Sequence, residues 1–360
     1  WVLDDVTSLH QINDGLADES VQLLQPRPSI RLRSPGASRK PSTSKQYRLS
    51  LGADVTYTEE AGPGGVTVRR FLDAGENPPR GVMVNYHLKE KPEGEITLRV
   101  LDSQGAEIKT FTSATLGNES GNVDREPRLL AESGMNRFVW DMRYPDARKV
   151  PGDKTTEDMN TGPVAPPGNY RLSLSVGDIE QSSDFQIIKD PRVAASQADF
   201  DAQFNLHIGI RDKLSETHDS INRLRSIRRQ LEEWEERAKS HSSAEAVADA
   251  AAPLKEKLTD IENELVQVDH KGARDRLNLP VKLNRKLAEL VAVVASADFA
   301  PPRQVGEVFQ ELSAGIDAQI GKLDGLVEED LAQFVTVVEE LGIPAVIPNA
   351  TPPANARNRG

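Results

Sequence analysis

The sequence predicts a β-then-α fold, in which an immunoglobulin-like antiparallel β-sandwich is followed by an antiparallel helical bundle. Three observations support this prediction. About six or seven short segments between residues 66 and 192 alternate apolar and polar residues, as half-buried strands do. Turn signals separate these segments at intervals of about ten residues, which is typical of a sandwich. After Pro191 the apolar period becomes three or four, which is the period of an α-helix.

Two strands and a turn are expected to open the sandwich. Apolar residues alternate over 82–88 and again over 96–100, and Pro92-Glu93-Gly94 lies between them. Because a short turn between two alternating segments is the pattern of a hairpin, we predict that these two strands pair. A short strand around 108–111 follows.

A second group of strands contains the largest aromatic residues of the segment. Phe138, Trp140 and Met142 share one face of a strand, and Tyr170 leads another that follows a Pro-Pro-Gly corner. A last strand near 185–188 ends at an Asp-Pro turn. Because Trp140 and Tyr170 lie on the apolar faces, we expect both rings to be in the core.

The remaining sequence predicts four helices. Ser196 is a suitable N-cap for a helix of nearly forty residues, and a turn at 240–243 leads to a second helix. Two long helices joined by a short loop are antiparallel neighbours. The segment 272–280 interrupts helicity before a third helix, and Pro301-Pro302 separates the third helix from a fourth.

Composition divides the chain into five parts. WVLDDVTSL begins like an apolar strand, so 1–21 is expected to hold a terminal strand. Pro, Ser and basic residues dominate 22–65, which predicts a connector that lies along a surface. The sandwich is assigned to 66–192 and the bundle to 193–341. The Pro-rich segment 342–360 is expected to be a disordered tail.

The connector offers a second hypothesis, because it is basic in an otherwise acidic chain. In that hypothesis the segment docks on a partner through its basic side chains. These basic residues are Arg27, Arg31, Arg33, Arg39 and Lys40.

The strand-like string at residue 1 predicts that the chain begins inside a longer protein.

Composition excludes several classes of function. The net charge of −12 argues against nucleic-acid binding, which requires a basic face. The absence of cysteine excludes disulfides, thiolate nucleophiles and zinc–thiolate sites. No apolar stretch reaches the roughly 18 residues that cross a bilayer, so we predict no membrane span.

No catalytic, metal or cofactor site is predicted. Asp4 and Asp5 are adjacent and would point to opposite faces of a strand, so they cannot flank one glycosidic bond. His207 and His218 would lie about 16 Å apart along one helix, too far to share a metal ion. The sequence also lacks HExxH, GxSxG, GxxxxGK[ST] and GxGxxG. The one candidate binding residue is Tyr144, whose ring could stack on a sugar just past the strand that carries Trp140.

Several strings resemble a known group of proteins. FVWDMRYP and PPGNYRLSL, together with GVMVNYHLKEKPEGEITLRVLDSQG, are similar to the C-terminal part of large exported bacterial proteins with BNR/sortilin-type β-propellers. Those proteins are often labelled glycosyl hydrolases or xyloglucanase-like. WVLDDVT resembles the outermost strand that closes such a propeller, and the middle module resembles the immunoglobulin-like domain of the flagellar hook-cap protein.

The resemblance implies a non-catalytic accessory or scaffolding region, located in the periplasm or secreted. Its first partner would be the N-terminal β-propeller of the same protein, and an envelope protein or a polysaccharide would be others. The sequence contains no Asp-box, and the resemblance does not include the propeller itself. No functional residue of those proteins is therefore assigned to a position of this sequence. The alternative is an accessory carbohydrate-binding region of a glycoside hydrolase acting on β-glucan-type polysaccharide.

Overall fold

The computed structural model describes residues 6–343, except 14, 17, 33–45, 50–55, 62–66, 73–78, 115–126, 157–158, 240 and 273. The chain forms two units. The β unit consists of Trp1–Asp146, Thr161–Gly209 and Val294–Pro302, and the helical unit of Ala147–Asn160, Ile210–Val293 and Arg303–Gly360. The last described strand ends at Lys189 and the first α-helix begins at Gln197, which confirms the β-then-α layout.

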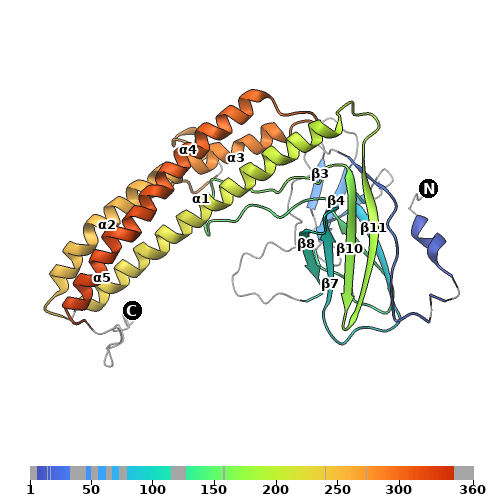
Figure 1. Cartoon of the computed structure of the whole chain (residues 1–360), viewed down its shortest axis with the longest axis horizontal. Helices are drawn as coiled ribbons and strands as arrows, with labels where there is room; N and C mark the ends of the chain where they lie inside the picture. The colour runs from blue at the N-terminus through green and yellow to red at the C-terminus, as the bar shows by residue number, and fades with distance from the viewer. Residues whose placement is uncertain are drawn as a thin grey trace. The chain divides into compact units, whose positions relative to one another are not determined.

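Two sheets of the β unit share one hydrophobic core. The three-stranded sheet has the order β1-β6-β9, and the five-stranded sheet has the order β2-β11-β10-β7-β8. Figure 1 shows β8, β7, β10 and β11 of the five-stranded sheet. Neighbouring strands are antiparallel except for β2 and β11, which are parallel. The strands are β1 (Val21–Leu23), β2 (Ser29–Arg31), β6 (Val82–Leu88), β7 (Ile96–Leu101), β8 (Glu107–Thr112), β9 (Gly134–Trp140), β10 (Gly168–Val176) and β11 (Ile179–Lys189).

The core contains the apolar faces that the alternation predicts. Tyr86 and Trp140 come from the three-stranded sheet, whereas Leu98, Leu172 and Phe185 come from the five-stranded one, and all five are buried in a single cluster. Trp140 is fully buried, and its ring meets those of Tyr170 and Phe185 edge-on, with centroids 6.2 Å away in both cases. The prediction that Trp140 and Tyr170 are core residues is therefore confirmed.

The predicted hairpin between 82–88 and 96–100 is wrong. Both strands exist, but β6 pairs with β1 and β9, whereas β7 pairs with β8 and β10. The segment between them carries the chain from one sheet to the other. Alternation shows which face of a strand is buried, but it does not show whether the next strand pairs with it in the same sheet or lies in the sheet across the core.

The expected irregular connector at 22–65 is also corrected. Val21–Leu23 and Ser29–Arg31 form β1 and β2, while β3 (Gln46–Leu49) and β4 (Thr56–Ala61) form a further antiparallel sheet with β5 (Thr67–Phe71). β1 and β2, with three residues each, are too short to display a period. Of the strand expected at the start of the chain, residues 1–5 lie outside the described residues, and Thr7–Gln11 form a 3-10 helix, η1.

Arg31 of the hypothetical docking segment is buried, not available for docking. Its Nη1 donates to Asp298 Oδ1 at 2.8 Å, and its Nη2 donates to Gln203 Oε1 at 3.1 Å. The guanidinium also lies over the Phe200 ring, 4.7 Å from the centroid. Within the β unit, Arg31 thus ties β2 to the first turns of the following helix and to the 294–302 segment. Arg33, Arg39 and Lys40 lie outside the described residues.

All four predicted helical segments are present. The first begins with a capping box, because the Asp199 amide donates to Ser196 Oγ at 3.2 Å and the Ser196 amide donates to Asp199 Oδ2 at 2.8 Å. The fourth is interrupted by a π-turn, η4, at Leu326–Asp330. The helices are α1 (Gln197–Ala238), α2 (Ala244–Leu265), α3 (Leu283–Val294), α4 (Arg303–Gly325) and α5 (Leu331–Glu340).

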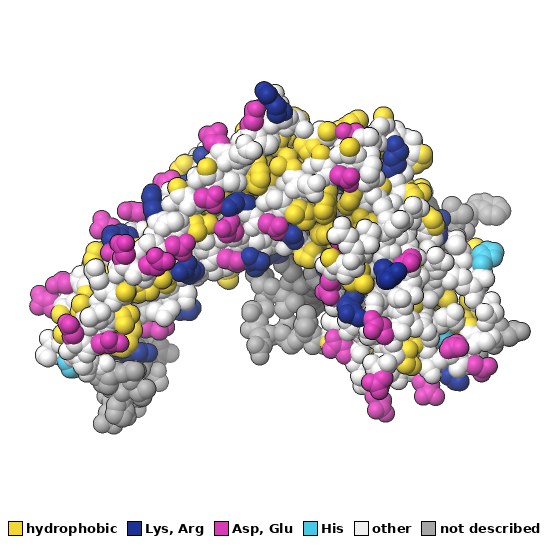
Figure 2. All heavy atoms as spheres, in the orientation of Figure 1, with side chains coloured by type: hydrophobic (Ala, Val, Ile, Leu, Met, Phe, Trp, Pro, Cys, Tyr) yellow, Lys and Arg dark blue, Asp and Glu magenta, His cyan; other side chains and the backbone are white. Residues whose placement is uncertain are grey.

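Ion pairs fix the directions of the long helices in the helical unit. Arg225 of α1 contacts Glu262 of α2 at 2.6 Å, and Glu235 contacts Lys255 at 2.7 Å, so the residue numbers run in opposite directions. This confirms that α1 and α2 are antiparallel. Acidic and basic side chains are interspersed with hydrophobic ones over the visible helical surface in Figure 2. Among the described helices, none is long and apolar enough to cross a membrane.

Candidate functional site

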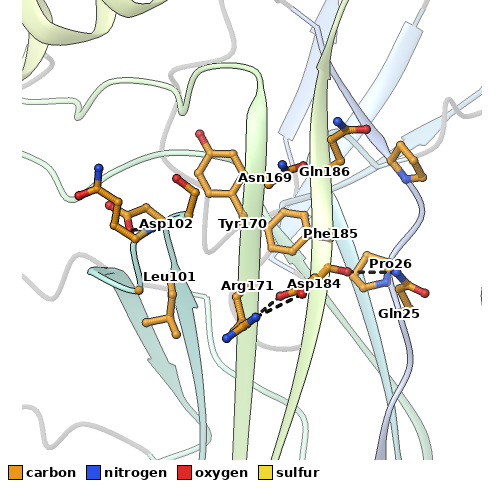
Figure 3. A pocket seen from close by; sticks show the side chains of 14 residues that line it. Gln25, Pro26, Leu101, Asp102, Asn169, Tyr170, Arg171, Asp184, Phe185 and Gln186 are labelled. Carbon is orange, nitrogen blue, oxygen red and sulfur yellow. Dashed lines mark hydrogen bonds and ion pairs between the residues drawn. The ribbon is translucent and has the colours of Figure 1, made fainter.

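A polar groove of about 750 Å³ lies on the β unit (Figure 3). Strands β10 and β11 pass through it, the β7–β8 turn borders it on one side, and the segment between β1 and β2 borders it on the other. The groove therefore combines three parts of the chain that are far apart in sequence. Its lining residues are Gln25, Pro26, Pro28, Leu101, Asp102, Ser103, Gln104, Gly105, Asn169, Tyr170, Arg171, Asp184, Phe185 and Gln186.

The strand alternation of β10 and β11 places polar side chains on the exposed face of the sheet. Tyr170 and Phe185 turn their rings to the core, where the rings stack with centroids 5.7 Å apart. Asn169 and Arg171 flank Tyr170 in the chain and are therefore on the opposite face, where both are exposed. Two buried rings thus support a polar surface.

An ion pair lies across the two strands in the groove. Arg171 and Asp184 are directly opposite in register, and Arg171 donates through Nε to Oδ1 at 2.7 Å and through Nη2 to Oδ2 at 3.2 Å. The hydrogen bond from Arg171 is the main cause that holds the pKa of Asp184 below its usual value. This bidentate geometry leaves the carboxylate ionised and its charge compensated.

Local hydrogen bonds hold both borders of the groove. On one side, Asp102 Oδ1 accepts from the amides of Gln104 at 2.8 Å and Ala106 at 2.9 Å, and Gly105 supplies the positive φ of 84°. On the other side, the Gln11 side chain makes two hydrogen bonds of 2.8 Å with the Gln25 backbone, donating through Nε2 to the carbonyl oxygen and accepting at Oε1 from the amide. The borders are therefore organised before any ligand arrives.

The neutral side chains of the groove remain available for hydrogen bonds. Asn169 and Gln186 lie directly opposite each other in the β10–β11 register, one pair beyond Arg171 and Asp184. Within the described part of the chain, neither amide has a hydrogen-bond partner, and the side chains of Ser103 and Gln104 have none either. Each amide can donate and accept, so the groove can bind a neutral polar ligand.

Tyr144, the candidate predicted from the sequence, lies outside this groove. Its side chain is half-buried just after β9, and its ring contacts that of Phe204 with centroids 4.7 Å apart and an interplanar angle of 61°. Trp140 and Tyr170 are buried. These three rings do not form one exposed platform.

The two histidines of α1 make separate structural contacts. In the β unit, His207 Nε2 is 3.2 Å from the Thr161 carbonyl oxygen. In the helical unit, His218 is fully buried, with Nδ1 2.5 Å from the Arg148 carbonyl oxygen, and its Nε2 has no hydrogen-bond partner in the part of the chain that the structure describes. Burial lowers the pKa of His218 below its ordinary value. Among the described residues, no group of three or more His, Asp or Glu side chains is placed to hold a metal ion.

Comparison with known proteins assigns no family to this fold and groove. No protein-family model matches the chain, and no curated protein matches it. Among solved structures, a chain named pT26-6p is 10% identical, with 80% of this chain and 49% of that chain covered and a TM-score of 0.16. This chain thus spans about half the length of that protein, and so low a TM-score supports no conclusion about fold or function.

Proposed function

We propose that this chain is a non-catalytic scaffolding region of an exported β-propeller protein, located in the periplasm or secreted. In this proposal residues 1–21 connect to the propeller, an immunoglobulin-like sandwich follows, and the helical bundle packs against the propeller or an envelope protein. The propeller and the export are part of this proposal because FVWDMRYP and PPGNYRLSL resemble segments of exported β-propeller proteins. The strand topology supports the sandwich and its attachment to a preceding domain.

The strand order supports an immunoglobulin-like sandwich. β1, β6 and β9 correspond to strands A, B and E of that fold, and β7, β10 and β11 correspond to strands C, F and G. A tyrosine near the start of strand F is typical of the fold, with its hydroxyl bonded to backbone a few residues upstream. Tyr170 is the third residue of β10, and its hydroxyl donates to the Pro166 carbonyl oxygen at 2.7 Å.

The observation that most favours scaffolding is the way in which the N-terminal segment is built into both sheets. β1 joins the three-stranded sheet and β2 joins the five-stranded sheet. Gln181 of β11 also binds the backbone of β1, donating to the Val21 carbonyl at 2.7 Å and accepting from the Leu23 amide at 2.7 Å. A domain joined through this segment would be fixed to the sandwich, and would not hang on a loose linker.

The test uses the full-length protein that contains this chain. Spin labels on the propeller and the sandwich should report one narrow distance distribution. Gln181→Ala should broaden that distribution and speed hydrogen exchange of the β1 amides, because β1 loses both side-chain contacts. Ser182→Ala is the matched control, since Ser182 follows Gln181 in β11, lies on the opposite face of the sheet and is exposed. A broad distribution in the unmodified protein would refute the scaffolding proposal.

The polar groove favours a second candidate, an accessory carbohydrate-binding region that acts beside a glycoside hydrolase on β-glucan-type polysaccharide. Its hydrogen-bonding side chains that have no partner among the described residues are neutral amides and a hydroxyl, which suit sugar hydroxyls. The test is retention of the intact chain on insoluble β-glucan, and failure of the chain to bind any neutral polysaccharide would refute this candidate.

A further inference from the structure

We propose that the groove between the β7–β8 turn and the β1–β2 segment is the sugar-binding site, and that Asn169 and Gln186 are its main hydrogen-bonding residues. The ligand would be a neutral oligosaccharide. This inference rests on the carbohydrate-binding candidate above and assigns it a place and a ligand class. The volume of about 750 Å³ lies within the range of about 300–1,000 Å³ that small-molecule sites have.

The charges of the groove favour a neutral ligand. Its lining contains one cation, Arg171, and two carboxylates, Asp102 and Asp184. Arg171 and Asp184 neutralise each other, while Asp102 accepts two backbone hydrogen bonds in its turn. Among the described residues that line the groove, an anion would therefore meet no available cation, and the net charge of the chain is −12.

The geometry of the amide pair suits adjacent hydroxyl groups. Residues directly opposite on antiparallel strands have Cβ atoms about 4.5–5.5 Å apart, so the amides of Asn169 and Gln186 can reach one small ligand together. Each amide offers an oxygen acceptor next to a nitrogen donor, and each hydroxyl of a sugar both donates and accepts. Two neighbouring hydroxyls can therefore satisfy both amides at once.

Apolar surface in the same groove suits the carbon face of a sugar ring. Pro26, Pro28 and Leu101 line the groove beside its polar residues. In Figure 3, Pro26 lies on the side of β11 and Leu101 on the side of β7, with Arg171 and Asp184 between them. A pyranose ring presents C–H groups on its faces and hydroxyls at its rim, so it can use both kinds of lining.

A peptide is a less suitable ligand for this groove. Peptides that add to a sheet pair with the main chain of an edge strand. β10 already pairs with β7 and β11 on its two sides, and β2 pairs with the outer side of β11 over Ile187–Lys189, next to the groove. Peptides that lie in grooves need apolar anchor pockets, whereas the apolar residues of this groove are divided between its two borders, with Pro26 and Pro28 in the β1–β2 segment and Leu101 at the end of β7. A peptide ligand is therefore the alternative that the experiment must exclude.

The experiment titrates the intact chain with cellohexaose and, separately, with mannohexaose, a neutral unstructured hexapeptide and inorganic phosphate, by calorimetry and amide NMR. We expect at least one hexaose to bind and to shift the amide signals of β10 and β11. Asn169→Ala with Gln186→Ala should raise Kd about ten-fold, the effect of losing one or two hydrogen bonds. Ser182→Ala, on the same face outside the groove, is the control and should leave Kd unchanged.

The outcomes separate this inference from the function on which it rests. A hexaose bound equally well by the double variant would overturn the groove assignment and leave the carbohydrate-binding candidate intact. No binding of either hexaose would overturn both. Binding of the peptide or of phosphate through Asn169 and Gln186 would overturn the ligand class. Because both side chains are exposed, the double variant should keep the circular dichroism of the parent chain.

Discussion

Removing the indole of Trp140 should destabilise the β unit by about 4 kcal/mol. The side chain is fully buried between the two sheets, and its Nε1 donates to the Arg143 carbonyl oxygen at 3.1 Å. Burial of about 200 Å² at about 25 cal/mol per Å² gives about 5 kcal/mol, and core Trp→Ala changes cost about 3–5 kcal/mol. Trp140→Phe should cost less, because the ring volume is partly kept and only the hydrogen bond is lost outright.

Native-state hydrogen exchange of the intact chain is the appropriate assay, because it measures the opening free energy of the strands separately from that of the helices. Trp140→Ala should lower protection throughout β6, β9, β10 and β11. Trp234→Ala is the control, since Trp234 is half-buried on α1 and contacts Arg237 at 5.0 Å. A change of less than about half a kcal/mol in the strands would show that the core does not depend on Trp140.

Three further predictions concern polar groups that are buried. Arg31→Ala should destabilise the β unit by about 3 kcal/mol because it leaves Asp298 buried without its cation, and the double variant with Asp298→Ala should lose less than the sum of the two single changes in urea unfolding. Tyr170→Phe removes a single hydroxyl hydrogen bond and should cost about 1 kcal/mol by the same assay, so an unchanged midpoint would count against the tyrosine corner. The folded helical unit keeps His218 neutral with a lowered pKa, whereas the unfolded chain takes up a proton below about pH 6.5. Stability should therefore be constant above that pH and fall by up to about 1.4 kcal/mol per pH unit below it, and His218→Gln should flatten this slope in unfolding measured from neutral to mildly acidic pH.

The period of the apolar residues was sufficient to predict the type of an element where the segment was long. The apolar spacing from Phe200 to Trp234 predicted α1, and Ser196 predicted its start, because capping and amphipathicity are properties of neighbouring residues in the chain. The alternation around Trp140 and Tyr170 predicted two strands and their buried faces for the same reason. The shortest strands could not be predicted in this way, since β1 and β2 have three residues each and display no period.

The groove could not be found from the sequence. Asn169 and Arg171 are visible as the polar positions of an alternating strand, and any exposed strand face has such residues. Gln186 and Asp184 become their neighbours only through the β10–β11 register. Gln25 and Pro26 join the site through a parallel pairing of β2 with a strand more than 150 residues later in the chain. Only Tyr144 had an individual signal, and its ring packs on Phe204 outside the groove.

The sequence by itself determined the β-then-α layout, the long helices and the buried faces of the main strands, because each depends on a repeat within one segment. Tertiary structure alone decided that β6 and β7 belong to different sheets, that the first strands complete both sheets, and that Arg31 is buried against Asp298. The physical reason is that pairing and burial between distant segments depend on which surfaces fit together in three dimensions, and a pattern along one segment does not contain that information.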